Sequence, residues 1–211
     1  MAIEPSFFDE LARLERSLRQ RTDSRRQGQQ QSPNVGEGLT FSDYRRYTPG
    51  DDVRLIDWRV YARTDEHFIK QFEAERNLTV HILLDTSASM DFGEGPEHKF
   101  EFGARFALAF AYFAAAGHDS FRFSTFRTDV ERLDRGRSTR GELLRLLDSV
   151  NAVDPDGRTD FVESLEGYAR TIRSRSLVVV VSDFLEDPGE IEDGLTAFGD
   201  SDVLLVHVVA P

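Results

Sequence analysis

The chain is 211 residues long, contains no cysteine and carries a formal net charge of −12. This length allows one domain with a full hydrophobic core and a small appendage. The lack of cysteine excludes disulfides, thiolate zinc sites and cysteine nucleophiles, and the negative charge argues against a nucleic-acid partner. No apolar run approaches the roughly 20 residues of a membrane span, and no signal peptide is recognisable. We therefore expect a cytoplasmic protein.

The basic residues are almost all arginine, since Lys70 and Lys99 are the only lysines. A GC-rich genome favours arginine over lysine, but it does not explain why 38 acidic residues outnumber 26 basic ones. Many carboxylates with almost no lysine suggest the hypothesis of a halophile, a protein adapted to high salt. Unfolding at low ionic strength would support this hypothesis, and full stability in dilute buffer would count against it.

Residues 1–77 are predicted to form a helix, a linker and a small subdomain. Apolar residues at helical spacing predict a helix over residues 6–20, and the polar, glutamine-rich stretch that follows predicts a linker to residue 35. Residues 36–77 contain a predicted strand at 67–72 and form a subdomain that we expect to pack on the main domain. Its arginines and aspartates suit a catalytic site, but mutually satisfied ion pairs are the favoured interpretation, because no nucleophile lies among them.

Residues 78–211 alternate between predicted strands and helices. The segments 78–84 and 177–181 are almost wholly apolar, which is typical of central strands that are buried on both faces. Further strands are predicted at 119–126, 129–133 and 203–209, and helices at 100–116, 140–147, from 160 to about 172, and from 188. This alternation predicts an α/β fold with a doubly wound, mainly parallel sheet.

Oxygen-bearing side chains follow the first apolar strand. Asp85, Ser87 and Ser89 are spaced i, i+2, i+4, so in an extended loop they can converge on one point. Such hard oxygen ligands suit magnesium, manganese or calcium and do not suit zinc. The ordinary alternative is a turn that caps the next helix. This stretch alone does not decide between the two.

Two later positions favour the metal site. Asp183 ends the second apolar strand, and Asp187 already serves as the cap of the following helix. Thr159 precedes Asp160, which is the better cap there, so the threonine hydroxyl is left free. In open α/β sheets, ligands bind beyond the carboxyl ends of the strands. The oxygen-bearing residues of the Asp85–Ser89 loop, together with Thr159 and Asp183, therefore predict a metal site at one edge of the sheet.

These residues also resemble known families. Asp85-x-Ser87-x-Ser89, a later threonine and a later aspartate resemble the metal-ion-dependent adhesion site of von Willebrand factor type A domains. The upstream run Tyr47-x-Pro-Gly-Asp-Asp-x-Arg-x-Ile-Asp-Trp-x-x-x-Ala-Arg63, followed by that loop, resembles the bacterial and archaeal proteins of domain-of-unknown-function family 58. The resemblance covers about residue 36 to the end.

The resemblance implies a von Willebrand factor A-like (Rossmann-like) domain at 78–211. It implies a magnesium site, with manganese or calcium as alternatives, whose residues are Asp85, Ser87, Ser89, Thr159 and Asp183. Two carboxylates and three hydroxyls leave the ion under-neutralised, so an acidic residue of a protein partner can complete its coordination. The resemblance further implies a non-enzymatic binding module that works with an AAA+ ATPase of the MoxR type in chaperone-like assembly or activation of a target complex.

Three residues flank the loops and are candidate contacts for a partner: Met90, Phe92 and Arg158. Ordinary packing is the favoured explanation for the first two. The chain departs from the resembled families because it lacks the N-terminal membrane segments of many members. It also stops after the strand at 203–209, where type A domains usually add a helix. We therefore expect a truncated chain or a short member with an exposed sheet edge.

The rival interpretation is a magnesium-dependent phosphohydrolase of the haloacid-dehalogenase kind. Those enzymes also place an aspartate after a first buried strand and another after a later strand. Their first loop has the pattern Asp-x-Asp, in which the second carboxylate is the acid/base; here that position is Ser87. No lysine is expected where a phosphate partner would be needed. A third possibility is a purely structural domain whose site binds no ion.

Overall fold

The structure is a computed structural model that describes residues 3–26, 39–74, 79–136 and 139–210. The chain divides into two units, one made of Met1–Ser24 with Asn77–Pro211 and the other of Arg25–Arg76. Among the helices of the described ranges, none is long and apolar enough to cross a membrane.

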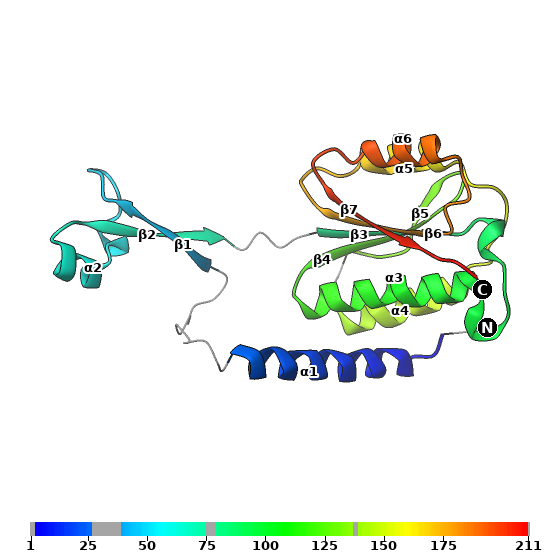
Figure 1. Cartoon of the computed structure of the whole chain (residues 1–211), viewed down its shortest axis with the longest axis horizontal. Coiled ribbons are helices and arrows are strands. Elements are labelled where there is room, and N and C mark those ends of the chain that lie inside the picture. Colours follow the sequence, from blue (N-terminus) through cyan, green and yellow to red (C-terminus); the bar gives the residue numbers. More distant parts are fainter. Residues whose placement is uncertain (1–2, 27–38, 75–78, 137–138, 211) are drawn as a thin grey trace. The chain divides into compact units, whose positions relative to one another are not determined.

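The larger unit is built on a five-stranded sheet in the order β5-β4-β3-β6-β7 (Figure 1). Strands β3, β4, β6 and β7 run parallel, and the short β5 pairs antiparallel with β4. The predicted α/β fold with a doubly wound, mainly parallel sheet is therefore confirmed. The strands are β3 (Thr79–Asp85), β4 (Ser120–Phe126), β5 (Val130–Arg132), β6 (Leu177–Ser182) and β7 (Asp202–His207).

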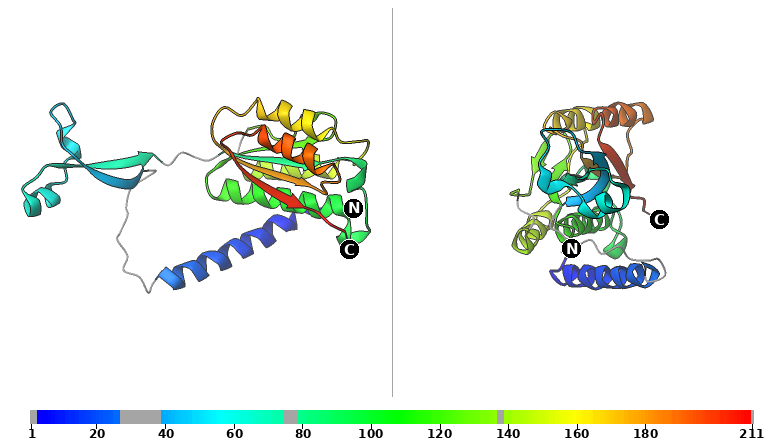
Figure 2. Two further views of the ribbon diagram at one scale, coloured as in Figure 1. Left: turned by 45° about the horizontal axis from the view of Figure 1, so that its top comes forward. Right: turned by 90° about the vertical axis from the view of Figure 1, so that its left-hand side faces the viewer.

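Helices cover both faces of this sheet (Figures 1 and 2). One face carries α3 (Lys99–Ala116) and α4 (Arg140–Asn151), and the other carries α5 (Phe161–Ala169) and α6 (Pro188–Thr196). Successive side chains of a strand point to opposite faces. Ile82 and Leu84 therefore enter the core beneath α3, while Leu83 enters the core beneath α5. The alternating side chains of β3 thus contribute to two cores at once.

Helix α1 (Ser6–Arg26) belongs to the larger unit as far as Ser24. Phe8 and Leu11 are buried in the core beneath α3, and the Tyr112 hydroxyl donates to Glu15 at 3.0 Å. The predicted end of this helix at residue 20 is wrong. Arginines, which are good helix formers, occupy positions 21, 25 and 26, and no glycine or proline lies between residues 20 and 28. The rest of the predicted linker lies outside the described residues.

The smaller unit pairs β1 (Leu39–Arg46) with β2 (Phe68–Ala74) in an antiparallel ladder. The predicted strand at 67–72 is confirmed, whereas β1 and the short helix α2 (Trp58–Thr64) were not predicted. The register of β1 shifts between Phe41 and Asp43, and such a bulge breaks the period of two that identifies a strand. Ion pairs support the structural interpretation of this segment: Arg45–Asp51 at 2.9 Å, Arg46–Glu66 at 2.8 Å and Arg54–Asp52 at 2.7 Å.

Two helix ends in the larger unit differ from prediction. Helix α4 continues four residues beyond 147, to Asn151, because the buried Val150 extends its apolar face. Helix α5 ends at Ala169 instead of about 172, where Thr171 donates its hydroxyl to the Tyr168 carbonyl at 2.7 Å. The last strand, β7, lies at the sheet edge, and its Leu204 and Leu205 are 40% and 43% exposed.

His81 makes the stability of the larger unit depend on pH. Its Nδ1 lies 2.9 Å from the Tyr168 hydroxyl, and burial, followed by the charge of Arg122, lowers the pKa of His81 to about 4. Between pH ~6.5 and ~4 the unfolded chain therefore binds a proton at this residue that the folded chain does not bind. We expect the free energy of unfolding to decrease as pH falls through this window.

Urea unfolding of the wild type and of a His81→Gln variant at pH 7 and pH 5 checks this expectation. The wild type should lose more stability on acidification than the variant. An equal loss in the two proteins would show that His81 does not carry the effect.

Candidate metal centre

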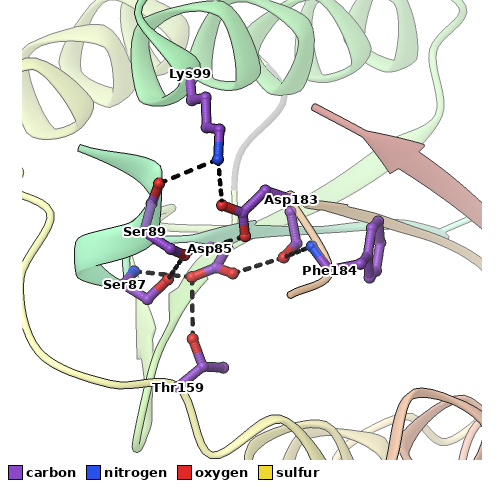
Figure 3. A network of polar contacts seen from close by, with 8 residues as sticks. Asp85, Ser87, Ser89, Lys99, Thr159, Asp183 and Phe184 are labelled. Carbon is purple, nitrogen blue, oxygen red and sulfur yellow. Dashed lines mark hydrogen bonds and ion pairs between the residues drawn. The ribbon is translucent and has the colours of Figure 1, made fainter. Parts of the chain in front are cut away.

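Three loops at the carboxyl end of the sheet bring the five predicted residues into one network (Figure 3). Asp85 is the last residue of β3, and the 3-10 turn Ala88–Met90 follows it. Asp183 follows β6, the parallel neighbour of β3, so the two strands end side by side. Thr159 precedes α5. The structure therefore places the five predicted residues together, as parallel strands that end at one edge require.

Asp85 is fully buried at the centre of this network. It accepts hydrogen bonds from the Ser182 hydroxyl at 2.6 Å, from the Ser87 backbone N–H at 2.8 Å and from the Thr159 hydroxyl at 3.5 Å. Burial raises the pKa of the Asp85 carboxyl; the hydrogen bonds oppose this, and the charge of Asp183 raises the pKa further. A charged carboxylate in this position is stabilised by a nearby cation.

The two serines connect Asp85 to Asp183. The hydroxyls of Ser87 and Ser89 lie 3.0 Å apart, and Ser89 donates to Asp183 Oδ1 at 3.1 Å. Asp183 is buried, with 2% of its surface exposed. The hydroxyls of the loop thus lie between the two carboxylates.

Lys99 is a member of the site that sequence reasoning missed. It is the first residue of α3, and its Nζ lies 2.8 Å from Asp183 Oδ2 and 3.4 Å from the carbonyl oxygen of Ser89. The expectation that no lysine lies where a phosphate partner would be needed is therefore wrong. In an α/β fold the helix after a strand begins near that strand's carboxyl end. The predicted start of the helix at residue 100 was therefore the sequence signal that could have placed Lys99 near the site.

Glu186 is a second residue that the sequence did not single out. Its Oε2 is buried and has no hydrogen-bond partner among the described residues. The pKa of Glu186 is raised, chiefly by burial. Hydrogen bonds from its own backbone N–H and from the Thr159 hydroxyl oppose this rise, and the charges of Asp85 and Asp183 add to it. A third carboxyl group therefore lies within electrostatic reach of the network. Its only signal in the sequence is its place three residues after Asp183.

The three candidate contact residues differ from one another. Met90 is fully buried in the core beneath α3, so its prediction as a contact for a partner is wrong and packing explains it. Phe92 is 59% exposed, and the Lys99 ammonium lies 5.3 Å from the centroid of its ring. Arg158 is exposed. Packing therefore does not explain Phe92 or Arg158.

The donor set fits a hard divalent cation. Every predicted ligand offers a carboxylate or hydroxyl oxygen, the atoms that magnesium and calcium bind. Within the described ranges, no three histidine, cysteine, aspartate or glutamate side chains converge closely enough to hold a metal ion, so an ion here would depend on the hydroxyls as well. The buried Glu186 oxygen that lacks a partner is the kind of atom that a cation would satisfy.

A family model described as "Protein of unknown function DUF58" matches residues 43–211. The chain belongs to the DUF58 family. It is 29% identical over 187 residues to uncharacterized proteins of Mycobacterium tuberculosis and Mycobacterium bovis, which covers 86% of this chain and 58% of each relative. This DUF58 chain therefore spans somewhat more than half the length of the curated relatives that it matches.

Solved structures of low sequence identity are similar to the DUF58 chain. The conserved hypothetical protein BatB from Bacteroides thetaiotaomicron is 16% identical, with a TM-score of 0.47 and coverage of 61% of this chain and 64% of that one. A von Willebrand factor type A protein from Catenulispora acidiphila is 15% identical, with a TM-score of 0.45 and coverage of 64% and 34%.

Proposed function

We propose that this DUF58 protein is a non-enzymatic, metal-dependent protein-binding module. A magnesium ion would be held by Asp85, Ser87, Ser89, Thr159 and Asp183, and it would bind an acidic side chain of a partner protein. The observation that carries the proposal is the network of buried and half-buried side chains that connects β3, β6 and the loop before α5. Manganese or calcium would use the same oxygens.

The ion would supply a positive centre with an open coordination position, and the chain's own groups would define its surroundings. Both oxygens of Asp85 already accept hydrogen bonds, which fixes the orientation of this carboxylate. The Ser87 and Ser89 hydroxyls add oxygen ligands without adding negative charge. Such a site remains attractive to a further carboxylate, and the exposed Phe92 offers an apolar contact beside it.

The rival phosphohydrolase gains one supporting observation, because Lys99 lies at the site. Two features still favour binding. Both oxygens of Asp85, which would be the nucleophile, accept hydrogen bonds that lower their nucleophilicity. Position 87 is a serine, which leaves the reaction without the second carboxylate as acid/base. Magnesium-dependent turnover of a small phosphate ester that is lost in Asp85→Ala would overturn the binding-module proposal.

We further propose that the partner is an AAA+ ATPase of the MoxR type and that the pair acts in chaperone-like assembly or activation of a target complex. This choice of partner follows from what the resemblance to domain-of-unknown-function family 58 implies. The geometry of the site adds a requirement, namely that the ATPase or its target presents an exposed aspartate or glutamate to the ion.

Co-purification with the MoxR-type ATPase of the same organism tests the proposal. We expect the ATPase to be retained in magnesium and lost in EDTA, and lost with an Asp85→Ala variant in either buffer. The matched control is Asp200→Ala, which removes an exposed carboxylate from a different part of the unit and should retain the ATPase. Retention that ignores both EDTA and Asp85→Ala would place the interface away from the metal site.

A further inference from the structure

We propose that Lys99 competes with the metal ion for Asp183, so that magnesium binds only when the lysine ammonium leaves this carboxylate. The inference rests on the proposed function, because it concerns the regulation of the same site. It gives Lys99 the role of setting the metal concentration at which the site fills.

The contacts of Asp183 leave little room for a second cation. Its Oδ2 accepts from the Lys99 ammonium at 2.8 Å, and its Oδ1 accepts from the Ser89 hydroxyl at 3.1 Å. The side chains of Lys99 and Asp183 are 13% and 3% exposed. A divalent ion that approaches Asp183 in this buried position meets the ammonium directly, and like charges at short range repel strongly where water is excluded.

The positive charge of Lys99 also lowers the affinity of the site for a divalent cation. Asp85 and Asp183 are the two carboxyl groups among the proposed ligands, and the ammonium of Lys99 is paired with Asp183 at 2.8 Å, where it offsets negative charge. This pairing removes a cost of burying Asp183, but it also lowers the attraction of the site for a divalent cation. Lys99 therefore stabilises the metal-free site and weakens its affinity for metal.

In the position where it contacts Asp183, the Lys99 ammonium also lies near an aromatic ring. Lys99 is the first residue of α3, and its flexible side chain lies with the ammonium 5.3 Å from the centroid of the Phe92 ring. Phe92 is 59% exposed, so the ammonium can keep a cation–π contact while it moves toward water. Metal binding would then move the Lys99 ammonium to the exposed surface, where a partner's acidic side chain is expected to bind.

The first test compares the magnesium affinity of the wild type, Lys99→Met and Lys99→Arg by isothermal titration calorimetry. Methionine keeps most of the side-chain volume without the charge, so we expect at least tenfold tighter binding. Arginine keeps the charge and should remain within threefold of the wild type. The control Arg170→Met removes a charge from a side chain that is 75% exposed and should leave the affinity within twofold.

The second test uses the unmodified chain and does not depend on a variant that folds. Lys70 and Lys99 are the only lysines, so Lys70 is an internal reference for labelling by a water-soluble acetylating ester, read by mass spectrometry. Saturating magnesium should increase the labelling rate of Lys99 several-fold and leave that of Lys70 unchanged.

The outcomes separate the inference from the proposed function. No heat of magnesium binding in the wild type or in any variant would overturn the metal site itself. Wild-type binding that Lys99→Met leaves unchanged or weakens would overturn only the role of Lys99. Labelling of Lys99 that magnesium leaves unchanged or slows would do the same.

Discussion

An Asp85→Asn variant is expected to lose its response to magnesium while remaining at least as stable as the wild type in the absence of metal. Burial and the charge of Asp183 raise the pKa of Asp85, so its charged form destabilises the metal-free fold at neutral pH. Asparagine removes that charge and keeps an oxygen acceptor for the Ser87 N–H at 2.8 Å. With magnesium at a hundredfold excess over its dissociation constant, the wild type should gain about 2.7 kcal/mol and the variant nothing.

Urea unfolding with and without magnesium measures both effects. The matched control is Asp200→Asn, a neutralised carboxylate that is exposed to solvent, and it should gain as much from magnesium as the wild type. Stabilisation by magnesium that survives in Asp85→Asn would exclude Asp85 as a ligand. A variant much less stable than the wild type without metal would contradict the argument from burial and repulsion.

A Phe161→Ala variant is expected to lose about 3–5 kcal/mol of unfolding free energy, the range found for buried phenylalanine in well-packed cores. Phe161 opens α5, is 2% exposed, and its ring centroid lies 5.9 Å from those of Phe126 and Phe184. It therefore joins the end of β4 to the residue after Asp183. We expect the magnesium affinity to fall as well, because the loop that carries Asp183 loses this support.

Phe102→Ala is the control for this truncation. Phe102 lies on α3 with 50% of its surface exposed, so its removal should change the stability by no more than about 0.5 kcal/mol. Chemical denaturation of the three proteins at one pH gives both values. A loss below about 1 kcal/mol in Phe161→Ala would mean that the two aromatic contacts do not hold the site in place.

The sequence predicted the sheet and the place of the site because local patterns determine both. The apolar runs of β3 and β6 identify central strands, and parallel pairing then brings Asp85 and Asp183 to one edge. The capping argument also holds, since Asp160 accepts from the Glu163 N–H and Asp187 from the Gly189 N–H. The side chains of Thr159 and Asp183 are thus not needed as helix caps.

The features that sequence reasoning missed depend on contacts between distant residues. Lys99 is separated from Asp183 by 84 residues, and only the start of α3 above the strand ends brings them together. Glu186 lies in a loop without a repeating pattern, so nothing local shows that its Oε2 is buried. The bulge in β1 likewise hides a strand whose pairing with β2 is evident only in three dimensions.

The central claim is that Asp85 and its neighbours hold a divalent ion. Manganese binding followed by electron paramagnetic resonance tests it most directly, because free and bound manganese give different signals. The account predicts one manganese ion bound per wild-type chain, released by excess magnesium, and no specific binding in Asp85→Asn. A wild-type chain that binds no manganese, or a variant that binds it equally well, would contradict the account.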